Sequence, residues 1–474
     1  MSSHNFSQLR TILGILNKNV DILEESCKAN GTQIPDLSEP FHPDSEAFRR
    51  HKDAAEAANT IAAAAQHIAA ILTAPSVSLY HSVGGVLQSA AVRVCLEASV
   101  TEILREAGPQ GLHVDTIAKK ANLDSQKLSR LLRLLATNHF YREVTPEVFA
   151  NTRISSMLDT GKPSEMVLAD PEHKHDNTTG VPALVAMNLD ESFKAAAYIW
   201  EALSEPAKAN TDGSLTSPSP FTRTFGSGVT LYQYYERPNQ TFRASRFSIA
   251  MKGITAFRPP DNDVKAYNWA SLPAGSRVVD VGGGIGNVTY SIASKFEGLK
   301  FVVQDRPATI EDAKAWWADQ MPEAVSSGRV ALEVHDFLTP QPQHLQHNVA
   351  VFMIKQVLHN WSDEDAVKIL KYLRQAATPE TVLLAMEYIL PYACRDPGDA
   401  IGAIPGAVPR EAPEPLLANY GLAGEMEYLS DINMLVLFDA QARTAPQYER
   451  LFRSAGWKLR FVNREVQALE AVPL

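Results

Sequence analysis

The sequence predicts an α/β protein in which a doubly wound, mostly parallel sheet follows a largely helical N-terminal half. From about residue 276, short runs rich in β-branched residues alternate with stretches of helical period, as in "RVVDVG" followed by "NVTYSIASKF". Such alternation is typical of a parallel sheet covered by helices on both faces. Before residue 260 the apolar residues recur mostly at helical spacing, and β-like pieces are limited to "YREV" and "VFANT".

The composition is that of a globular protein and disfavours several classes of function. The chain has 474 residues, of which 45% are hydrophobic and 21% charged, and its formal net charge is −10. An acidic chain repels a phosphate backbone, so we expect no nucleic-acid partner. Cys27, Cys95 and Cys394 lie far apart, which predicts neither a disulfide framework nor a metal site. No run approaches the roughly 18 apolar residues of a membrane helix, and we expect a cytoplasmic protein without a membrane partner.

Three parts are predicted along the chain. Residues 1–52 form a helical arm and linker, residues 53–260 a helical region with a winged-helix-like portion, and residues 261–474 the sheet domain. The apolar stripe of the arm and the Ala-rich helix "DAAEAANTIAAAAQHIAAIL" favour a contact with a second copy of the chain. Ordinary packing within one chain explains them equally well. A Pro-rich insertion at 392–421 interrupts the sheet domain.

Residues 91–153 have the rhythm of a helix–turn–helix followed by a wing. One helix is expected in "AAVRVCLEASVTEILREAG", and two more in "HVDTIAKKANL" and "DSQKLSRLLRLLATNHF". Five basic residues raise the question of DNA binding: Lys119, Lys120, Lys127, Arg130 and Arg133. Leucines fill much of the last helix and the chain is acidic, so we expect no DNA binding.

Residues 183–260 are predicted to be helical and are rich in aromatic side chains. Such side chains can line an apolar ligand pocket, and burial between ordinary helices explains them equally well. The candidates for a substrate pocket, drawn from this region and from the sheet domain, are Phe221, Phe225, Tyr232, Phe247, Met251, Trp361, Asn433 and Met434. Their apolar bias favours an aromatic or polyketide-like hydroxyl compound, with Asn433 as a polar anchor.

The loop at residues 282–286, "GGGIG", follows the first predicted strand of the sheet and precedes a helix. Glycines in such a loop let a ligand approach the backbone closely. The dinucleotide spacing GxGxxG lacks its third glycine, and no Gly-Lys-Ser/Thr follows, which excludes a Walker loop. An acid two residues before the first glycine, Asp280 before Gly282, and the short GxG that begins at Gly284 are instead the pattern of S-adenosylmethionine sites.

Acids at the ends of the next two predicted strands complete this pattern. Asp305 in "FVVQDRP" is placed to accept hydrogen bonds from ribose hydroxyls, and Arg306 directly follows it. Asp336 in "VHDF" is placed to accept from an adenine amino group, with Phe337 against the ring face. We therefore expect S-adenosyl-L-methionine as the cofactor and S-adenosyl-L-homocysteine as its product.

Methyl transfer to oxygen needs a base that takes the hydroxyl proton. His359 in "MIKQVLHNWSDEDAVKIL" follows the fourth predicted strand at the ligand-facing edge, where an imidazole can act near neutral pH. Glu387 in "LLAMEYIL" ends the next strand and is placed to orient that imidazole. The alternatives are a structural histidine and a surface carboxylate.

Six motifs in order carry a family resemblance: "VVDVGGGIG", "FVVQDRP", "VHDF", "IKQVLHNWSDED", "MEYILPYAC" and "QARTAPQYERLFRSAGW". Over about residues 80–465 the chain resembles the plant- and fungal-type class I S-adenosylmethionine-dependent O-methyltransferases, above all fungal members of secondary metabolism. The resemblance implies a winged-helix-like dimerisation domain, a homodimer and a Rossmann-like C-terminal domain. It assigns His359 as general base, and the cofactor positions that it assigns are Gly282, Asp305, Asp336, Phe337 and Lys355.

Two positions of the expected catalytic site depart from that family. Asn360 stands where the family usually has aspartate, and Ala442 stands where it usually has a glutamate that flanks the catalytic histidine. Because an alanine cannot stabilise an imidazolium, the proton-transfer site is expected to be depleted. We favour an O-methyltransferase. The alternatives are a pericyclase or dehydratase, in which Lys355 or His359 polarises a substrate carbonyl beside an unconsumed cofactor, and a cofactor-binding scaffold.

Overall fold

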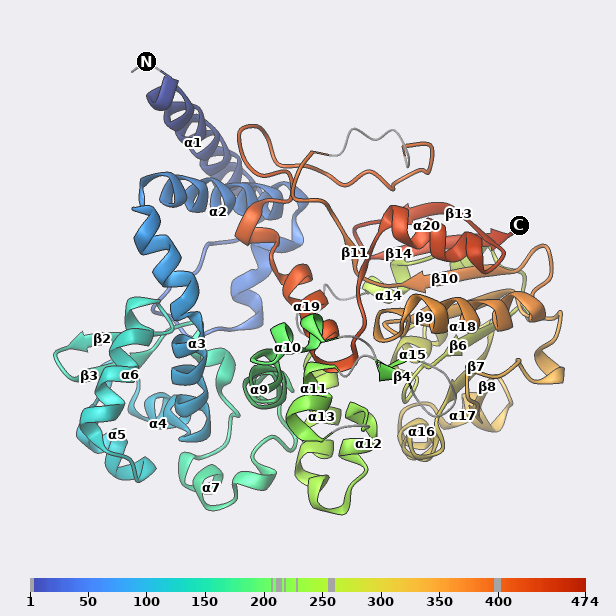
Figure 1. Ribbon diagram of the computed structural model, residues 1–474, viewed down its shortest axis with the longest axis horizontal. Helices are drawn as coiled ribbons and strands as arrows, with labels where there is room; N and C mark the ends of the chain where they lie inside the picture. Colours follow the sequence, from blue (N-terminus) through green and yellow to red (C-terminus); the bar gives the residue numbers. More distant parts are fainter. Residues whose placement is uncertain are drawn as a thin grey trace. The chain divides into compact units, whose positions relative to one another are not determined.

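The computed structural model describes residues 4–205, 208–209, 215–216, 219–226, 229–254, 261–395 and 402–474. The chain divides into two compact units (Figure 1). The N-terminal unit comprises Met1–Pro259 with the short returns Pro413–Leu416 and Tyr420–Ala423, and the sheet unit comprises Pro260–Ala412, Leu417–Asn419 and Gly424–Leu474. The further division of the N-terminal unit at residue 52 stays a prediction.

The N-terminal unit is mostly helical, as expected. Its helices are α1 (His4–Asn30), α2 (Lys52–Leu72), α3 (Pro75–Glu97), α4 (Val100–Ala107), α5 (Val114–Ala121), α6 (Ser125–Thr137), α7 (Ser164–Ala169), α8 (Val181–Met187), α9 (Phe193–Ala196), α10 (Ile199–Ser204), α11 (Pro220–Phe225), α12 (Leu231–Tyr235) and α13 (Thr241–Gly253). Its strands are β1 (Leu112–His113), β2 (Tyr141–Thr145), β3 (Val148–Asn151), β4 (Lys208–Ala209) and β5 (Leu215–Thr216). A 3₁₀ helix, Pro43–Arg50, lies within the predicted linker.

The winged-helix prediction is confirmed, with one difference in its first helix. Strands β1, β3 and β2 form an antiparallel sheet in that order, next to the helices α4, α5 and α6. The sequence predicts one helix over residues 90–108, but α3 ends at Glu97 and α4 begins at Val100, because Ser99 takes a left-handed conformation with φ of +52°.

Two of the five basic residues of this region, Lys120 and Arg133, pair with acids of the same unit. Arg133 donates to Glu143 at 2.9 and 3.0 Å and to Glu147 at 2.7 Å. On the same helix, Leu128 and Leu132 are buried in the core. Helix α6 therefore packs as a core helix.

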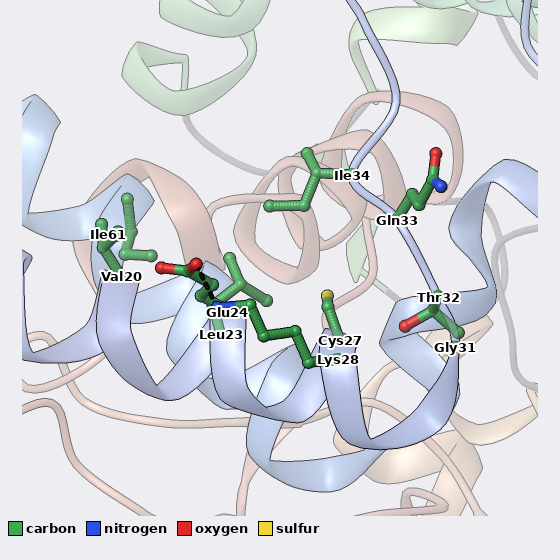
Figure 2. Close-up of a pocket in the computed structure, with 10 residues that line it drawn as sticks. All are labelled: Val20, Leu23, Glu24, Cys27, Lys28, Gly31, Thr32, Gln33, Ile34 and Ile61. Carbon is green, nitrogen blue, oxygen red and sulfur yellow. Dashed lines mark hydrogen bonds and ion pairs between the residues drawn. The ribbon is translucent and has the colours of Figure 1, made fainter.

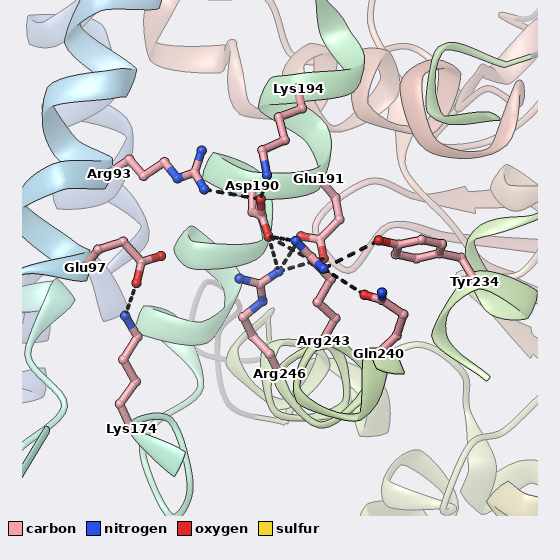
Figure 3. A network of polar contacts seen from close by, with 10 residues as sticks. All are labelled: Arg93, Glu97, Lys174, Asp190, Glu191, Lys194, Tyr234, Gln240, Arg243 and Arg246. Atoms are coloured by element: carbon pink, nitrogen blue, oxygen red, sulfur yellow. Dashed lines mark hydrogen bonds and ion pairs between the residues drawn. The ribbon is translucent and has the colours of Figure 1, made fainter. Parts of the chain in front are cut away.

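A buried ion network ties several helices of the N-terminal unit together (Figure 3). Asp190 and Glu191 lie in a π-helical turn, Asn188–Ser192, that follows α8. Arg246 of α13 is 2% exposed, and its Nη2 lies 3.1 Å from Asp190 and 2.6 Å from Glu191. Arg243 contacts both acids, and Arg93 of α3 reaches Asp190 at 3.3 Å. Burial of these charges is tolerated because each meets an opposite charge.

The described residues of the sheet unit form a seven-stranded sheet in the order β13-β14-β10-β9-β6-β7-β8. Strands β6 to β10 are parallel, whereas β14 runs antiparallel to β10 and β13 antiparallel to β14. The strands are β6 (Arg277–Val281), β7 (Lys300–Asp305), β8 (Val330–Val334), β9 (Val351–Lys355), β10 (Val382–Met386), β13 (Trp457–Asn463) and β14 (Ala468–Pro473), and the short pair is β11 (Ile389–Leu390) and β12 (Arg443–Thr444). The helices are α14 (Asn262–Lys265), α15 (Asn287–Ala293), α16 (Pro307–Gln320), α17 (Pro322–Ser326), α18 (Asp363–Ala376), α19 (Met426–Phe438) and α20 (Ala445–Ser454).

Helices cover both faces of this sheet, as the sequence predicts. Alternate residues of each strand point to opposite faces. Val279 and Phe352 pack in one core with α18 and α20, whereas Val278 and Met353 pack in the other with α15, α16 and α17. This is the doubly wound Rossmann-like arrangement.

Two details of the sheet differ from the prediction. Strand β14, whose sequence "ALEAVP" carries a weak β signal, inserts between β10 and β13 and was not expected. The run predicted as one strand over residues 381–390 ends as β10 at Met386 and resumes as β11, which pairs with β12. The interruption leaves Glu387 just beyond the edge of the sheet.

Two general predictions concern cysteines and membrane spans. The three cysteines are free, and Cys27 and Cys95 are buried. In the described parts of the chain, no single helix is long and apolar enough to cross a membrane; the pair α2 and α3, bent by 120°, meets the length and composition test only when both are taken together.

The ion network leads to a first testable prediction. Replacing Arg246 by alanine leaves Glu191 buried without its closest cation, and the free energy of unfolding is expected to fall by about 3–5 kcal/mol. Lys194→Ala is the matched control, because Lys194 also pairs with Asp190 but is 37% exposed on its side chain, and about 1 kcal/mol or less is expected. Urea unfolding of both variants measures the difference, and equal effects would contradict a stabilising role for the buried pair.

Candidate active site

The candidate site lies at the carboxyl edge of the sheet, where the strand order reverses. Strand β6 pairs with β7 on one side and with β9 on the other. The loops that follow β6 and β9 therefore lead away in opposite directions from two neighbouring strands. Ligands of open α/β sheets bind at such a switch point. The glycine loop follows β6, and the turn that carries His359 follows β9.

The glycine loop has a conformation that side chains would disturb. Gly282, Gly284 and Gly286 have φ of +67°, +61° and +87°. A Cβ added to Gly286 would lie 2.7 Å from Nε1 of Trp317, whose indole N–H donates to the carbonyl of Ile285 at 2.9 Å. A Cβ at Gly284 would meet nothing within 4 Å, so the loop faces open space at that residue.

Asp280 lies beneath this loop. It is 1% exposed, its Oδ2 accepts a hydrogen bond from the hydroxyl of Thr289 at 2.7 Å, and a Cβ at Gly283 would lie 2.5 Å from its carboxyl carbon. Burial raises the pKa of the Asp280 carboxyl from 3.8 to about 6. Its contacts in the structure hold the loop to α15.

Asp305 and Phe337 flank the same loop. The carboxylate of Asp305 accepts from the N–H of Gly284 at 2.9 Å and from the N–H of Arg306 at 2.8 Å. A Cβ at Gly282 would lie 3.4 Å from the ring of Phe337, which meets Trp361 edge to face at 5.7 Å between ring centroids. The two aromatic rings therefore form a wall beside the loop.

The remaining predicted cofactor residues lie at neighbouring strand ends. Asp336 is exposed and accepts from the N–H of Leu338 at 2.9 Å. Lys355, at the end of β9, pairs with Asp263 of α14 at 2.6 Å. Arg306 is exposed directly after β7.

His359 and Glu387 are brought together as the sequence predicts. His359 lies in a 3₁₀ turn, Leu358–Asn360, and is nearly buried, while Glu387 is completely buried. The Nδ1 atom of His359 lies 2.8 Å from Oε2 of Glu387, an ion-pair distance at which the two atoms are not aligned as a hydrogen bond. Oε1 of Glu387 accepts from the N–H groups of Val357 and Leu358 at 2.9 and 2.8 Å. One carboxylate thus holds both the turn and the imidazole.

Asn360 braces this turn from within. Its Nδ2 donates to the carbonyl of Gln356 at 3.2 Å. Gln356 has a left-handed φ of +52°, so the hydrogen bond stabilises a tight reversal just before the histidine.

Arg443 is a residue of this site that the sequence did not single out. Its guanidinium is 1% exposed and donates to the carbonyls of Leu358 and Trp361, which flank His359, at 2.9 and 3.0 Å. It also binds Asp363, the first residue of α18, at 2.7 Å. The sequence shows an arginine directly after Ala442, but the role of this arginine depends on the pairing of β11 with β12.

The predicted substrate residues fall into both units. Asn433 and Met434 are half-buried on α19, which packs against the turn Leu358–Asn360. The residues of the N-terminal unit form an aromatic cluster of their own: Phe221 is completely buried, stacks on Phe225 at 4.8 Å and meets Tyr234 edge-on at 5.5 Å.

The other aromatic pair of that unit is Tyr232 and Phe247, whose ring centroids lie 6.1 Å apart, and the nearby Met251 is half-buried. Phe221 therefore serves as a core residue within its unit, whereas Phe225, Tyr232 and Met251 keep partial exposure.

One hollow of the N-terminal unit lies beside α1 and α2 (Figure 2). It has a volume of about 730 Å³ and is lined by Val20, Leu23, Glu24, Cys27, Lys28, Gly31, Thr32, Gln33, Ile34 and Ile61. It contains none of the predicted site residues. Within the described residues no cluster of three or more histidine, cysteine or acidic side chains is arranged to hold a metal ion.

The residues at the glycine loop fit S-adenosylmethionine. Open space at Gly284 leaves room for a ligand against the loop, and the carboxylate of Asp305 lies at the end of the adjacent strand, where ribose hydroxyls are bound in this kind of fold. The ring of Phe337, which meets Trp361 edge to face, provides an apolar surface beside the loop.

Comparisons with known proteins agree with this assignment. Residues 200–404 match the O-methyltransferase domain, and residues 80–161 match the O-methyltransferase dimerisation domain. The chain is 46% identical to "4-O-methyltransferase 1" of Phanerochaete chrysosporium over 98% of its length and 99% of the relative's, and 30% identical to "3-O-methyltransferase 2" of the same fungus over 84% and 82%. The mitomycin 7-O-methyltransferase structure superposes with a TM-score of 0.60 at 20% identity, over 86% of this chain and 99% of the other.

The fold and the site define a class I methyltransferase. The chain belongs to the O-methyltransferase family, and it is an S-adenosylmethionine-dependent O-methyltransferase. The sequence-based recognition of the family, its cofactor and its enzymatic class are confirmed.

The buried carboxyl of Asp280 leads to a prediction about pH. Because its pKa is raised in the folded protein, its proton is retained on folding, and the stability associated with this carboxyl is present below pH 3.8 and lost as the pH rises to about 6. Asp280→Asn keeps an acceptor for Thr289 but does not titrate. Over this window we expect the free energy of unfolding of the wild-type protein to fall by about 3 kcal/mol, and the variant to lack this fall. Urea midpoints at pH 4.5 and 7.0 measure it. Asp336→Asn, at an exposed carboxyl, is the control, and identical pH profiles for all three proteins would contradict the assignment.

Proposed function

We propose that the protein transfers a methyl group to a hydroxyl of an aromatic or polyketide-like small molecule, with His359 as the general base. The observation that carries this proposal is the pair of His359 and Glu387, 2.8 Å apart at the edge of the sheet where the glycine loop also ends. A nearly buried imidazole beside a buried carboxylate is a common arrangement for moving a proton.

When bound, S-adenosylmethionine supplies an electrophilic methyl group. Glu387 is held by two backbone N–H groups, and its second oxygen faces Nδ1 of His359, which favours the tautomer with its proton on that nitrogen. The Nε2 atom then has a free lone pair to accept the proton of the substrate hydroxyl. The negative charge of Glu387 stabilises the imidazolium that results.

The cofactor contacts are part of the proposal. Asp305 would accept hydrogen bonds from the ribose and Asp336 from the adenine amino group, and Phe337 would lie against the adenine ring. The loop at Gly282 and Gly284 would hold the amino-acid part of the ligand, with Asp280 supporting the loop from below. Lys355 and Arg306 border the same crevice. The fit of the loop and of Asp305 supports these roles.

The substrate class rests on chemistry and on the names of relatives. Trp361 faces Phe337 edge to face, and an aromatic wall favours a flat ring. Asn433 is a polar anchor and Met434 an adaptable apolar contact. Phe225, Tyr232 and Met251 of the N-terminal unit are half-buried and stay candidates on their sequence alone. Relatives named for 4-O- and 3-O-methylation support a hydroxyl acceptor.

Two variants are expected to separate binding from chemistry. His359→Gln should lower kcat at least about 100-fold, because general-base catalysis contributes about 10² to 10⁴. Its affinity for S-adenosylmethionine should stay unchanged. Asp305→Ala should instead lose most of that affinity. Calorimetry gives the affinities, and mass spectrometry follows the methylated product and S-adenosylhomocysteine with phenol, catechol, guaiacol and hydroxyanthraquinones as acceptors. Full activity of His359→Gln would remove the histidine from the mechanism.

We further propose that two copies of the chain form a homodimer through α3. Its apolar side chains Leu79, Val83, Val86 and Leu87 are each more than half exposed, and their spacing puts them on one face of the helix. Gly84 and Gly85 lie beside them with no atom within 4 Å of an added Cβ. Glycine lowers the stability of a helix interior, but its lack of a side chain lets another helix approach closely. The match of residues 80–161 to a dimerisation domain supports this contact.

A pair of charges on that face is expected to separate the copies. Val83→Glu combined with Leu87→Glu should convert a dimer into a monomer, because the carboxylates would be buried at the interface without partners. Light scattering after gel filtration reports the mass. Met166→Glu, on an exposed residue of α7, is the control and should leave the dimer intact. A monomeric wild-type protein at micromolar concentration would contradict the proposal.

A further inference from the structure

The missing glutamate at Ala442 raises the question of what supports the charged imidazole on that side. Ala442 is 4% exposed, and its methyl group carries no charge. The side chain at this position therefore supplies no charge to the imidazole. Glu387, in contrast, faces Nδ1 of His359 and is bound to the backbone of the turn.

A different carboxylate, that of Asp431, is bound to the backbone of Ala442. Asp431 of α19 is half-buried, and its Oδ1 accepts a hydrogen bond from the backbone N–H of Ala442 at 2.7 Å. Helix α19 packs against the turn Leu358–Asn360. The carboxylate of Asp431 interacts electrostatically with the charges of Arg443 and His359. The acid is thus bound to the backbone of the very residue whose side chain lacks one.

We propose that Asp431 replaces the absent glutamate as a positioning residue, whose negative charge stabilises the imidazolium of His359 during proton transfer. The inference rests on the proposed role of His359 as general base. The proton passes from the substrate hydroxyl to Nε2 of His359, and Asp431 stays ionised throughout, so its effect is electrostatic.

The other charged and titratable groups around His359 are Glu387, Arg443, Tyr388 and Tyr448. Glu387 faces Nδ1 from the end of β10. Arg443 from β12 opposes an imidazolium, but its guanidinium is paired with Asp363 of α18 at 2.7 Å and bound to backbone carbonyls. The ring of Tyr388 is stacked on His359 at 6.3 Å, and Tyr448 of α20 is completely buried. Asp431 supplies the second negative charge toward the imidazole.

Reciprocity strengthens the argument. Burial raises the pKa of the Asp431 carboxyl, while the N–H of Ala442 and the charges of Arg443 and His359 oppose this rise. A positive charge that forms on His359 therefore favours the ionised form of Asp431. By the same interaction energy, the ionised Asp431 favours the protonated His359.

The competing explanation is a structural one, in which Asp431 only anchors the N–H of Ala442. The side-chain oxygen of asparagine can accept the same hydrogen bond, whereas alanine cannot. Asp431→Asn therefore removes the charge and keeps the anchor, and Asp431→Ala removes both. Asp439→Asn, at the end of the same helix, is the matched control for a lost carboxylate.

The experiment measures kcat/KM against pH for these variants with the best acceptor of the phenol panel. Asp431→Asn should lower kcat/KM about tenfold and move the acidic limb of the profile to lower pH, because the imidazolium loses a stabilising charge. Adding Ala442→Glu to Asp431→Asn should restore much of the loss. A wild-type profile for Asp431→Asn, with a loss only in Asp431→Ala, would overturn the proposal in favour of the structural anchor.

Two further measurements separate this inference from the role of His359 itself. The His359 titration can be followed by NMR of histidine-labelled protein, with His359→Gln to assign its signal, and it needs no substrate. Asp431→Asn should move this titration to lower pH, and an unmoved titration would overturn the inference. In the His359→Gln background, Asp431→Asn should have no further effect on rate. Wild-type activity of His359→Gln would instead refute the proposed base, whatever the Asp431 variants do.

Discussion

The active site depends on one buried carboxylate, that of Glu387. It lies just past the end of β10, and one of its oxygens accepts two backbone N–H groups of the turn that follows β9. Its other oxygen faces the imidazole of His359. A buried carboxylate without such partners would be strongly unfavourable, so the turn and the acid stabilise each other. The histidine is therefore positioned by a residue at the edge of the sheet itself.

Arg443 also stabilises that turn through hydrogen bonds and a balanced charge. Arg443 donates to carbonyls on both sides of His359, and its charge is balanced by Asp363 at the start of α18. The turn is therefore held by an anion from one strand end and by a cation from a distant segment. Backbone groups that would otherwise be orphaned at the end of a strand are used to define the geometry of a catalytic side chain.

Much of this could be read from the sequence, because it rests on local patterns. The β-branched runs, the glycine loop and the placement of His359 and Glu387 after consecutive strands all follow from short stretches. The break at Ser99 and the strand β14 could not be read, since one depends on a single backbone angle and the other on pairing with distant strands. The role of Arg443 also depends on a distant pairing. The sequence shows that Ala442 carries no acid. It does not show that the carboxylate of Asp431, eleven residues earlier, accepts a hydrogen bond from the N–H of Ala442 in the folded chain.

The short parallel pair of β11 and β12 has a consequence for how this chain can diverge. Two residues on each side, Ile389 with Arg443 and Leu390 with Thr444, join segments that flank the Pro-rich insertion and α19. The entropic cost of closing a loop grows only with the logarithm of its length. The insertion can therefore change in length at a small cost in entropy while the pairing of β11 with β12 holds Arg443 in place. Length changes at exposed positions of the insertion therefore leave the catalytic geometry undisturbed, whereas Ala407 is fixed in the core of the sheet unit.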